Sequence, residues 1–198
     1  MKNVLYENPD IRKSARKLPE IYLGNRGLMI VDVVCSRQRK YENYVKSSLL
    51  PRYKAEVQDL SLNYLSTNAP DWMPLRQGEA QTMRKAAEVL INYGVEHRVV
   101  DEDEICFKWS HDIDSHHMML DVKGIGPALL QYMRMLSGAD TLKVDVRVIE
   151  TLREVGLPVH WFSAEGILQL CKDMSREIGC SLVELDQLLW HFVSLRNK

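Results

Sequence analysis

The feature of the sequence that best suggests a chemical role is the spacing of the glycines in residues 120–130. Gly124 and Gly126 flank Ile125, and Pro127 follows directly. A Gly-x-Gly turn permits a tight hairpin and leaves amides at the start of the next helix without intrahelical partners. Proline suits the first helical position, because its missing N–H costs nothing there. Such amides and the helix dipole can bind a phosphate oxygen. The simpler interpretation is a Gly-Ile-Gly turn between two helices, with no ligand.

Asp145 is the second candidate for chemistry, nineteen residues after Gly126. The segment between them is long enough for a helix and a loop, so we expect Asp145 to start the following helix. A carboxylate at a helix N-terminus stays ionised, because the dipole and the free amides favour the charged form. Such an anion suits a reaction whose transition state builds positive charge on a sugar. The simpler interpretation is that Asp145 is only an N-cap, and the two roles are compatible.

Residues 120–156 resemble the signature of the helix-hairpin-helix (HhH-GPD) superfamily of DNA base-excision glycosylases, which includes endonuclease III and the adenine and alkyl-purine glycosylases. In that family a hairpin of the type Leu-Pro-Gly-Val-Gly is followed about twenty residues later by Val-Asp and a helix. In this sequence Gly124-Ile-Gly126 stands at the hairpin, and Val144-Asp145 stands at the aspartate.

A looser match to the same family lies upstream. Residues 30–38 are similar to the helix that ends in Leu-Ser-x-Gln, which puts Gln38 at the place of the glutamine that fills the gap left by a flipped base. By itself the stretch 28–46 is ambiguous, because its β-branched residues suggest a strand while the following residues suit a helix. The resemblance favours a helix there. Residues 1–25 and 157–198 match the family only as helical content.

The resemblance implies an all-α fold of two helical lobes with a DNA-binding cleft. The central lobe would be 26–138, with the helix-hairpin-helix at about 115–137, and the second would combine 1–25 with 139–198. The partner would be double-stranded DNA with a damaged or mispaired base. This base must flip out of the stack before the enzyme can reach it. Asp145 would stabilise the oxocarbenium-like sugar and activate water, and a monovalent cation would sit on the hairpin carbonyls. The implied DNA contacts are Arg37, Gln38, Lys123, Gly124, Ile125, Gly126, Pro127 and Arg147.

The sequence departs from the family at three features, of which the first is the proline before the hairpin glycine, replaced here by Lys123. Bifunctional members carry a lysine two residues after the second hairpin glycine, and this lysine attacks the sugar to form a Schiff base. Here the residue is Ala128, which predicts a monofunctional glycosylase without lyase activity. Lys123 and Lys143 lie nearby in sequence and stay open as substitutes. Only Cys171 and Cys180 follow Asp145, whereas cluster-bearing members have four closely spaced cysteines, so no iron–sulfur cluster is expected.

Helical elements must position these residues. Glycine and proline divide the chain into about eight or nine segments of mostly helical period. A capping box, Ser181 to Glu184, opens the last helix. The stretch 95–118, with the acidic run 101–104, receives no assignment. Helices are predicted from Pro9 (capped by Asn8) to about Lys17, from Gly78 to Tyr93 with Gly94 as the terminating residue, over 127–137 and 145–155, and from 181 onward.

The bulk composition is that of an ordinary globular protein, with 45% apolar and 27% charged residues. The net charge of −1 excludes a global basic field. A local basic window spans 31–54, although a solvated helix face is the simpler interpretation. No set of cysteines and histidines has zinc-ligand spacing, so we expect no metal site. We expect a cytoplasmic protein with reduced thiols and no membrane partner, since no signal peptide or spanning segment is recognisable.

Three functions compete at this point. The first is an enzyme that hydrolyses the N-glycosidic bond of a damaged or mispaired base. The second is a non-catalytic helix-hairpin-helix protein that binds DNA and uses Asp145 only as a cap. The third is a helical interaction protein with no role on DNA, which the near-zero net charge supports.

Overall fold

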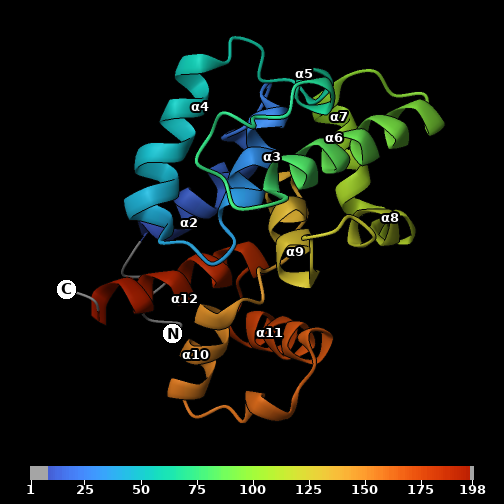
Figure 1. The fold of residues 1–198 in the computed structure, drawn as a ribbon. Coiled ribbons are helices and arrows are strands. Elements are labelled where there is room, and N and C mark those ends of the chain that lie inside the picture. Colours follow the sequence, from blue (N-terminus) through green and yellow to red (C-terminus); the bar gives the residue numbers. More distant parts are fainter. Residues whose placement is uncertain (1–8, 197–198) are drawn as a thin grey trace.

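The computed structural model describes residues 9–196, including their side chains except those at 160 and 193–196. Within these residues the chain forms eleven α-helices and no strand, so the prediction of an all-α fold is confirmed (Figure 1). Helix 9–17 begins as predicted, while its proposed cap, Asn8, lies outside the described residues.

The α-helices are α2 (Pro9–Lys17), α3 (Arg26–Cys35), α4 (Leu50–Glu56), α5 (Leu62–Thr67), α6 (Glu79–Glu96), α7 (Glu102–His111), α8 (His116–Leu120), α9 (Pro127–Leu136), α10 (Val146–Glu154), α11 (Ala164–Ile178) and α12 (Leu182–Arg196). Four shorter helical segments are η1 (Leu18–Glu20), η2 (Tyr41–Leu49, with π-type turns), η3 (Ile113–Ser115) and η4 (Val159–Trp161).

Helix α3 is the centre of the larger group of helices. All of its residues are buried, and it packs against α4, α5, α6, α7 and α9. A helix that is covered on every side needs apolar residues all round, which explains why the run Leu28–Cys35 also resembles a strand. Gly27 permits one close contact, because a β-carbon there would overlap the carbonyl oxygens of Leu60 and Ser61.

The helix expected over 28–46 is interrupted. Helix α3 ends at Cys35, and the Ser36 hydroxyl donates to the Val33 carbonyl at 2.7 Å. Gln38 then adopts a left-handed conformation, with φ of 53°. The chain resumes as a helix only at Tyr41, because a left-handed residue turns the backbone away from the helical path.

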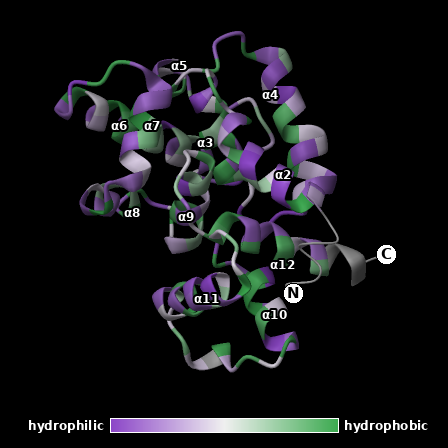
Figure 2. Ribbon diagram, turned by 180° about the vertical axis from the view of Figure 1, so that it is seen from behind, coloured by the Kyte–Doolittle hydropathy of each residue, from purple (hydrophilic) through white to green (hydrophobic). Residues whose placement is uncertain are grey.

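Buried apolar side chains form two clusters. One runs from Tyr22 to Leu136 and belongs mainly to α3–α9, and the other joins Ile11 of α2 to α10, α11 and α12. Figure 1 shows α10, α11 and α12 lying beside one another, apart from α4–α8, and Figure 2 shows hydrophobic stretches in both groups. Tyr22 packs in the first cluster, although the predicted boundary at residue 25 assigns it to the second lobe.

Gly94 does not terminate a helix, so the prediction of an end at this residue is wrong. Helix α6 continues through it to Glu96. A β-carbon at Gly94 would lie 2.5 Å from the Ile105 side chain. This glycine therefore allows α7 to pack closely against α6, and the sequence gives no sign of that distant neighbour. No helix of the described residues has the length and apolar character needed to cross a membrane.

The unassigned acidic run 101–104 is the start of α7. Asp101 caps this helix and accepts the Glu104 amide at 2.8 Å. Asp103 accepts the guanidinium Nε of buried Arg26 at 2.6 Å, and Glu102 accepts the Leu62 amide at 2.8 Å. Acidic residues are favourable in a first helical turn, and here they also bind neighbouring elements.

Candidate active site and nucleic-acid interface

The predicted hairpin lies between α8 and α9 and is held by its carbonyl groups. Gly124 has φ of 100°, in the region that favours glycine. The Thr82 hydroxyl donates to the Lys123 carbonyl at 2.7 Å, and Arg37 Nη1 donates to the Gly124 carbonyl at 3.3 Å. Ile125 is buried in the first cluster. The hairpin therefore rests on α6 and on the end of α3.

The start of α9, on the other side of the hairpin, has no such side-chain partner. Gly126 is the N-cap residue, and among the described residues no side chain caps this helix. A β-carbon at Gly126 would meet no atom within 4 Å. Pro127 occupies the first turn and is exposed, as is Lys123. Free amides at an open helix start form a suitable site for an anion.

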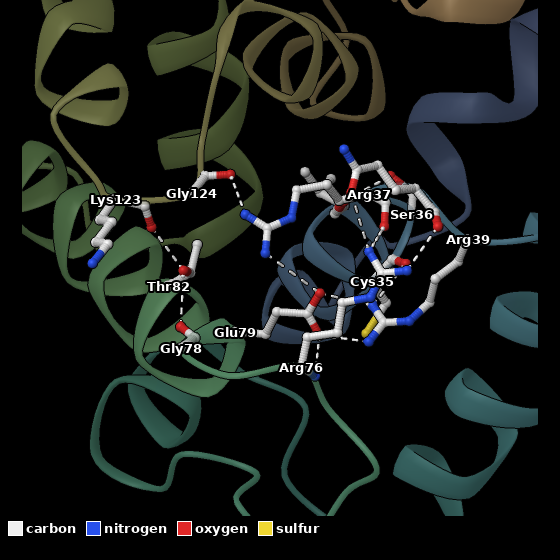
Figure 3. A network of polar contacts seen from close by, with 12 residues as sticks. Cys35, Ser36, Arg37, Arg39, Arg76, Gly78, Glu79, Thr82, Lys123 and Gly124 are labelled. Carbon is white, nitrogen blue, oxygen red and sulfur yellow. Dashed lines mark hydrogen bonds and ion pairs between the residues drawn. The ribbon is translucent and has the colours of Figure 1, made fainter.

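A buried carboxylate connects the hairpin to α3 (Figure 3). Glu79 is fully buried at the start of α6, and its two oxygens accept Arg39 Nη1 at 2.9 Å and Nη2 at 2.6 Å. The same carboxylate accepts the Arg76 amide at 2.9 Å and lies 3.7 Å from Arg37 Nη2. Arg37 therefore lies between Glu79 and Gly124. A buried carboxylate is tolerated only with such compensation.

Gln38 is exposed on the loop that follows α3, and its left-handed backbone is held by Arg76. Arg76 Nη2 donates to the Gln38 carbonyl at 2.8 Å, and Nη1 donates to the Arg37 carbonyl at 3.1 Å. These bonds satisfy carbonyls that the end of α3 leaves free. The loop that carries Gln38 is thus fixed beside Arg37.

Asp145 is the N-cap residue of α10, as predicted. Its Oδ1 accepts the amides of Arg147 at 3.0 Å and Val148 at 3.1 Å, and its Oδ2 lies 3.8 Å from Lys143 Nζ. The carboxylate is 21% exposed. The Arg147 guanidinium does not extend outward, because it stacks 4.4 Å from the ring centre of Trp190.

Lys143 is a site residue whose place the sequence does not reveal. It is 8% exposed, and its Nζ donates to the Ser36 hydroxyl at 3.2 Å and lies 4.4 Å from the Tyr132 ring centre. Burial lowers the pKa of its amine, although Asp145 and two further carboxylates oppose this shift. Lys143 has apolar neighbours in the sequence, but such neighbours do not distinguish a buried lysine from a surface one.

Asp32 is a second polar group that the sequence did not single out. It is fully buried, and its Oδ2 accepts the hydroxyls of Tyr22 at 2.7 Å, Tyr41 at 3.0 Å and Tyr132 at 3.0 Å. Burial raises the pKa of its carboxyl, and the tyrosine hydrogen bonds reduce this shift. Its Oδ1 has no partner among the described residues. The sequence feature that indicates this cluster of Asp32 and three tyrosines is the carboxylate inside the apolar run Leu28–Cys35.

A cavity of about 720 Å³ adjoins these groups, within the roughly 300–1,000 Å³ typical of ligand pockets. Lys143, rather than Asp145, lines its wall. The rings of Tyr41 and Trp190 meet edge to face at 6.4 Å between centres. Residues of α2, η2, α9 and α12 contribute, and the lining side chains include Tyr22, Tyr41, Tyr132, Lys143, Asp186 and Trp190.

A continuous path of contacts leads from the hairpin to Asp145. Gly124 contacts Arg37, the neighbouring Ser36 contacts Lys143, and Lys143 faces Asp145. The end of α3 therefore joins the starts of α9 and α10, which lie far apart in the sequence. The structure brings Arg37 and the hairpin together directly. Arg147 joins this path through its backbone amide, which bonds to Asp145, whereas Gln38 joins it only as the neighbour of Arg37.

The cation expected on the hairpin carbonyls fits two of them poorly. The Gly124 carbonyl already accepts a guanidinium, and a cation there would lie next to the positive charge of Arg37. The Lys123 carbonyl accepts the Thr82 hydroxyl. A cation site stays a prediction for the other hairpin carbonyls. The absence of an iron–sulfur cluster also stays a prediction.

Comparisons with known proteins give no match, whether with protein families, with curated proteins or with solved structures.

Proposed function

We propose that this protein is a DNA base-excision glycosylase that hydrolyses the N-glycosidic bond of a damaged or mispaired base. The observation that carries the proposal is the path of contacts from the hairpin through Arg37, Ser36 and Lys143 to Asp145. A phosphate on the free amides of α9 and a sugar beside the carboxylate of α10 would belong to the same stretch of DNA. Such an arrangement holds a nucleotide by its backbone while its sugar meets a fixed anion.

The cavity supports the same proposal, because a flipped base needs an apolar, aromatic space with a few polar groups. Tyr41 and Trp190 offer ring surfaces, while Lys143 and Asp186 offer polar atoms. Lys46 and Lys54 also line the cavity and are exposed, so they can meet the phosphates of the strand that enters.

Asp145 would act as the bond between sugar and base breaks. Departure of the base leaves positive charge on the sugar, which an anion nearby stabilises. Oδ1 is held by two helix amides, so the carboxylate is pre-oriented, and Oδ2 is free of those amides. Water then adds to the sugar carbon in place of the base, and the proton that this water loses goes to the departing base.

The test is single-turnover incubation with a panel of duplexes that each hold one damaged or mismatched base. Samples are divided between alkali treatment and none, so that base release and strand cleavage are read separately. Asp145→Asn should lower base release on the order of 10²-fold or more, because it removes the charge and keeps capping ability. The matched control is Asp101→Asn, which changes the cap of α7 far from the site and should leave the rate unchanged.

The second candidate function is non-catalytic DNA binding, which the capping role of Asp145 favours. Binding that weakens as salt rises, with no base released from any duplex, would establish this alternative. An unchanged release rate in Asp145→Asn would show that the carboxylate is a cap and nothing more. If the protein neither binds a duplex nor releases a base, the remaining function is that of a helical interaction protein with no role on DNA.

A further inference from the structure

Helix α2 presents three exposed cations on one face. Lys13 lies three and four residues before Arg16 and Lys17, so the three side chains are neighbours on the helix surface. Ile11 lies on the opposite face and packs with α12 in the second apolar cluster. We propose that these three cations, named the α2 basic face, bind the phosphate backbone of duplex DNA beside the damaged nucleotide. The choice of DNA as the partner rests on the proposed function, but no catalytic step is involved.

The α2 basic face is not neutralised by nearby carboxylates. On α7 the exposed Lys108 pairs with Glu104, one turn away, at 2.7 Å. Within residues 9–196, none of the three cations of α2 forms such an ion pair. The helix dipole stabilises cations near a C-terminus, which accounts for Arg16 and Lys17 in the last turn but not for Lys13. The positive charge of this face is therefore available to an external polyanion.

The α2 basic face borders a hollow of about 470 Å³. Of the six described residues that line this hollow, four are cations, namely Arg12 and the α2 basic face, and the other two are Pro9 and Glu20. Arg12 is directed toward α12, where its Nε lies 3.8 Å from Glu184 Oε1. A concave surface with this excess of positive charge suits a phosphate group, whose oxygens accept several charge-assisted hydrogen bonds.

The α2 basic face also lies beside the cavity. Asp10 and Ser14 of the same helix line the cavity, and Lys46 and Lys54 line it from η2 and α4. Figure 1 shows α2 between α4 and α12. From Lys13 to the end of α2 the helix rises about 6 Å, which is the axial length of about two phosphates of one strand. A strand whose base enters the cavity can therefore meet lysines of α4 on one side and the α2 basic face on the other.

Phosphate contacts carry no sequence information, so the α2 basic face should act on any duplex, including an undamaged one. The experiment measures the affinity of the full-length protein for a fluorescent, undamaged duplex by anisotropy over a series of sodium chloride concentrations. The test variant, named the α2 variant, combines Lys13→Gln, Arg16→Gln and Lys17→Gln. Glutamine has nearly the helix propensity of lysine and arginine, so α2 should remain folded, and circular dichroism checks this.

The matched control combines Lys108→Gln, Lys172→Gln and Arg176→Gln, which removes the same charge from the exposed surfaces of α7 and α11. We expect the α2 variant to bind about tenfold or more weakly at low salt, and its slope of log K against log salt should be smaller by about two to three. The control variant should change the slope by less than about one, because its residues lie away from the cavity.

Equal affinities and slopes of the two variants would overturn the inference. A weaker affinity with an unchanged slope would do the same, because it would come from altered structure rather than from lost phosphate contacts. If the α2 variant loses affinity for polyglutamate but not for the duplex, the face binds an acidic protein instead. Base release is measured separately: a salt-dependent loss in the α2 variant without base release from any duplex supports the α2 basic face and overturns only the glycosylase.

Discussion

Helices α9 and α10 begin with the same backbone conformation and with opposite chemistry. The N-cap residue Gly126 has φ of −108° and ψ of −179°, and the N-cap residue Asp145 has φ of −108° and ψ of 179°. At α10 a carboxylate accepts two of the first amides, whereas at α9 no side chain among the described residues does so. The N-cap side chain, rather than the backbone, therefore decides which helix start can receive an anion.

The two starts are also anchored differently. Donors hold the segment before α9, where Thr82 and Arg37 bind the carbonyls of the hairpin. An acceptor holds the segment before α10, where Asp186 binds the Lys143 amide. The start of α9 therefore keeps amides that a ligand can use, whereas the start of α10 places the Asp145 carboxylate beside Lys143. A helix start with uncapped amides and a helix start with a carboxylate cap thus occur in one protein whose net charge is −1.

The largest effect should come from breaking the anchor of the hairpin. Glu79→Ala leaves the guanidinium of Arg39, which is 5% exposed, without its carboxylate. We expect a loss of about 3–5 kcal/mol in the free energy of unfolding, because an unpaired charge stays buried. Urea denaturation measures it. The control Glu88→Ala removes two partly exposed ion pairs, with Arg84 and Lys85, and should cost within about 1 kcal/mol. Equal losses in the two variants would contradict the role of Glu79.

The anchor of α10 should give a pH-dependent stability. Burial raises the pKa of Asp186 from its ordinary 3.8 to about 7. Between these values the folded protein holds a proton that the unfolded chain releases, so stability falls as pH rises through this window. Asp186→Asn keeps the acceptor for the Lys143 amide and removes the titration. Relative to this variant, the unmodified protein should lose on the order of 1 kcal/mol per pH unit from about pH 4 to 7. Identical pH profiles of the two proteins in urea denaturation would exclude this account.

The smallest effect on stability should come from exchanging the two caps. Gly126→Asp gives α9 the start of α10, and the open space at Gly126 can accept the new side chain. Stability should rise by about 0.5 kcal/mol, because a carboxylate caps amides that glycine leaves free. Duplex binding should fall about tenfold or more, since the carboxylate takes the place of the phosphate. Removal of the other cap, in Asp145→Ala, should lower stability by about 1 kcal/mol. Unchanged duplex affinity in Gly126→Asp would place the phosphate contact elsewhere.

Local signals predicted much of the fold. Pro127 begins α9, Asp145 caps α10, and the capping box of Ser181 and Glu184 opens α12 with reciprocal bonds of 3.1 Å. Each of these features depends on residues within one turn of the chain. These features are therefore predictable from the local sequence alone.

Features that depend on distant neighbours were not predictable in the same way. The sequence around Gly94 predicts the end of a helix, but this glycine instead lies against the Ile105 side chain of the next helix. The sequence does not reveal that Lys143 is buried, because Tyr132 and Ser36, which enclose it, belong to distant parts of the chain. Burial is a property of the packed molecule, so the chemistry of such a lysine becomes visible only in three dimensions.

The cluster of tyrosines around Asp32 gives this protein a built-in optical signal. Burial raises the pKa values of Tyr22, Tyr41 and Tyr132, so these three tyrosines keep their protons to a higher pH in the folded state than in the unfolded chain. Unfolding releases their protons in alkaline solution, which makes the folded state lose stability as pH rises above about 10. The ultraviolet absorbance of phenolate therefore reports the opening of the helices around α3, and the protein needs no attached dye to be followed in time.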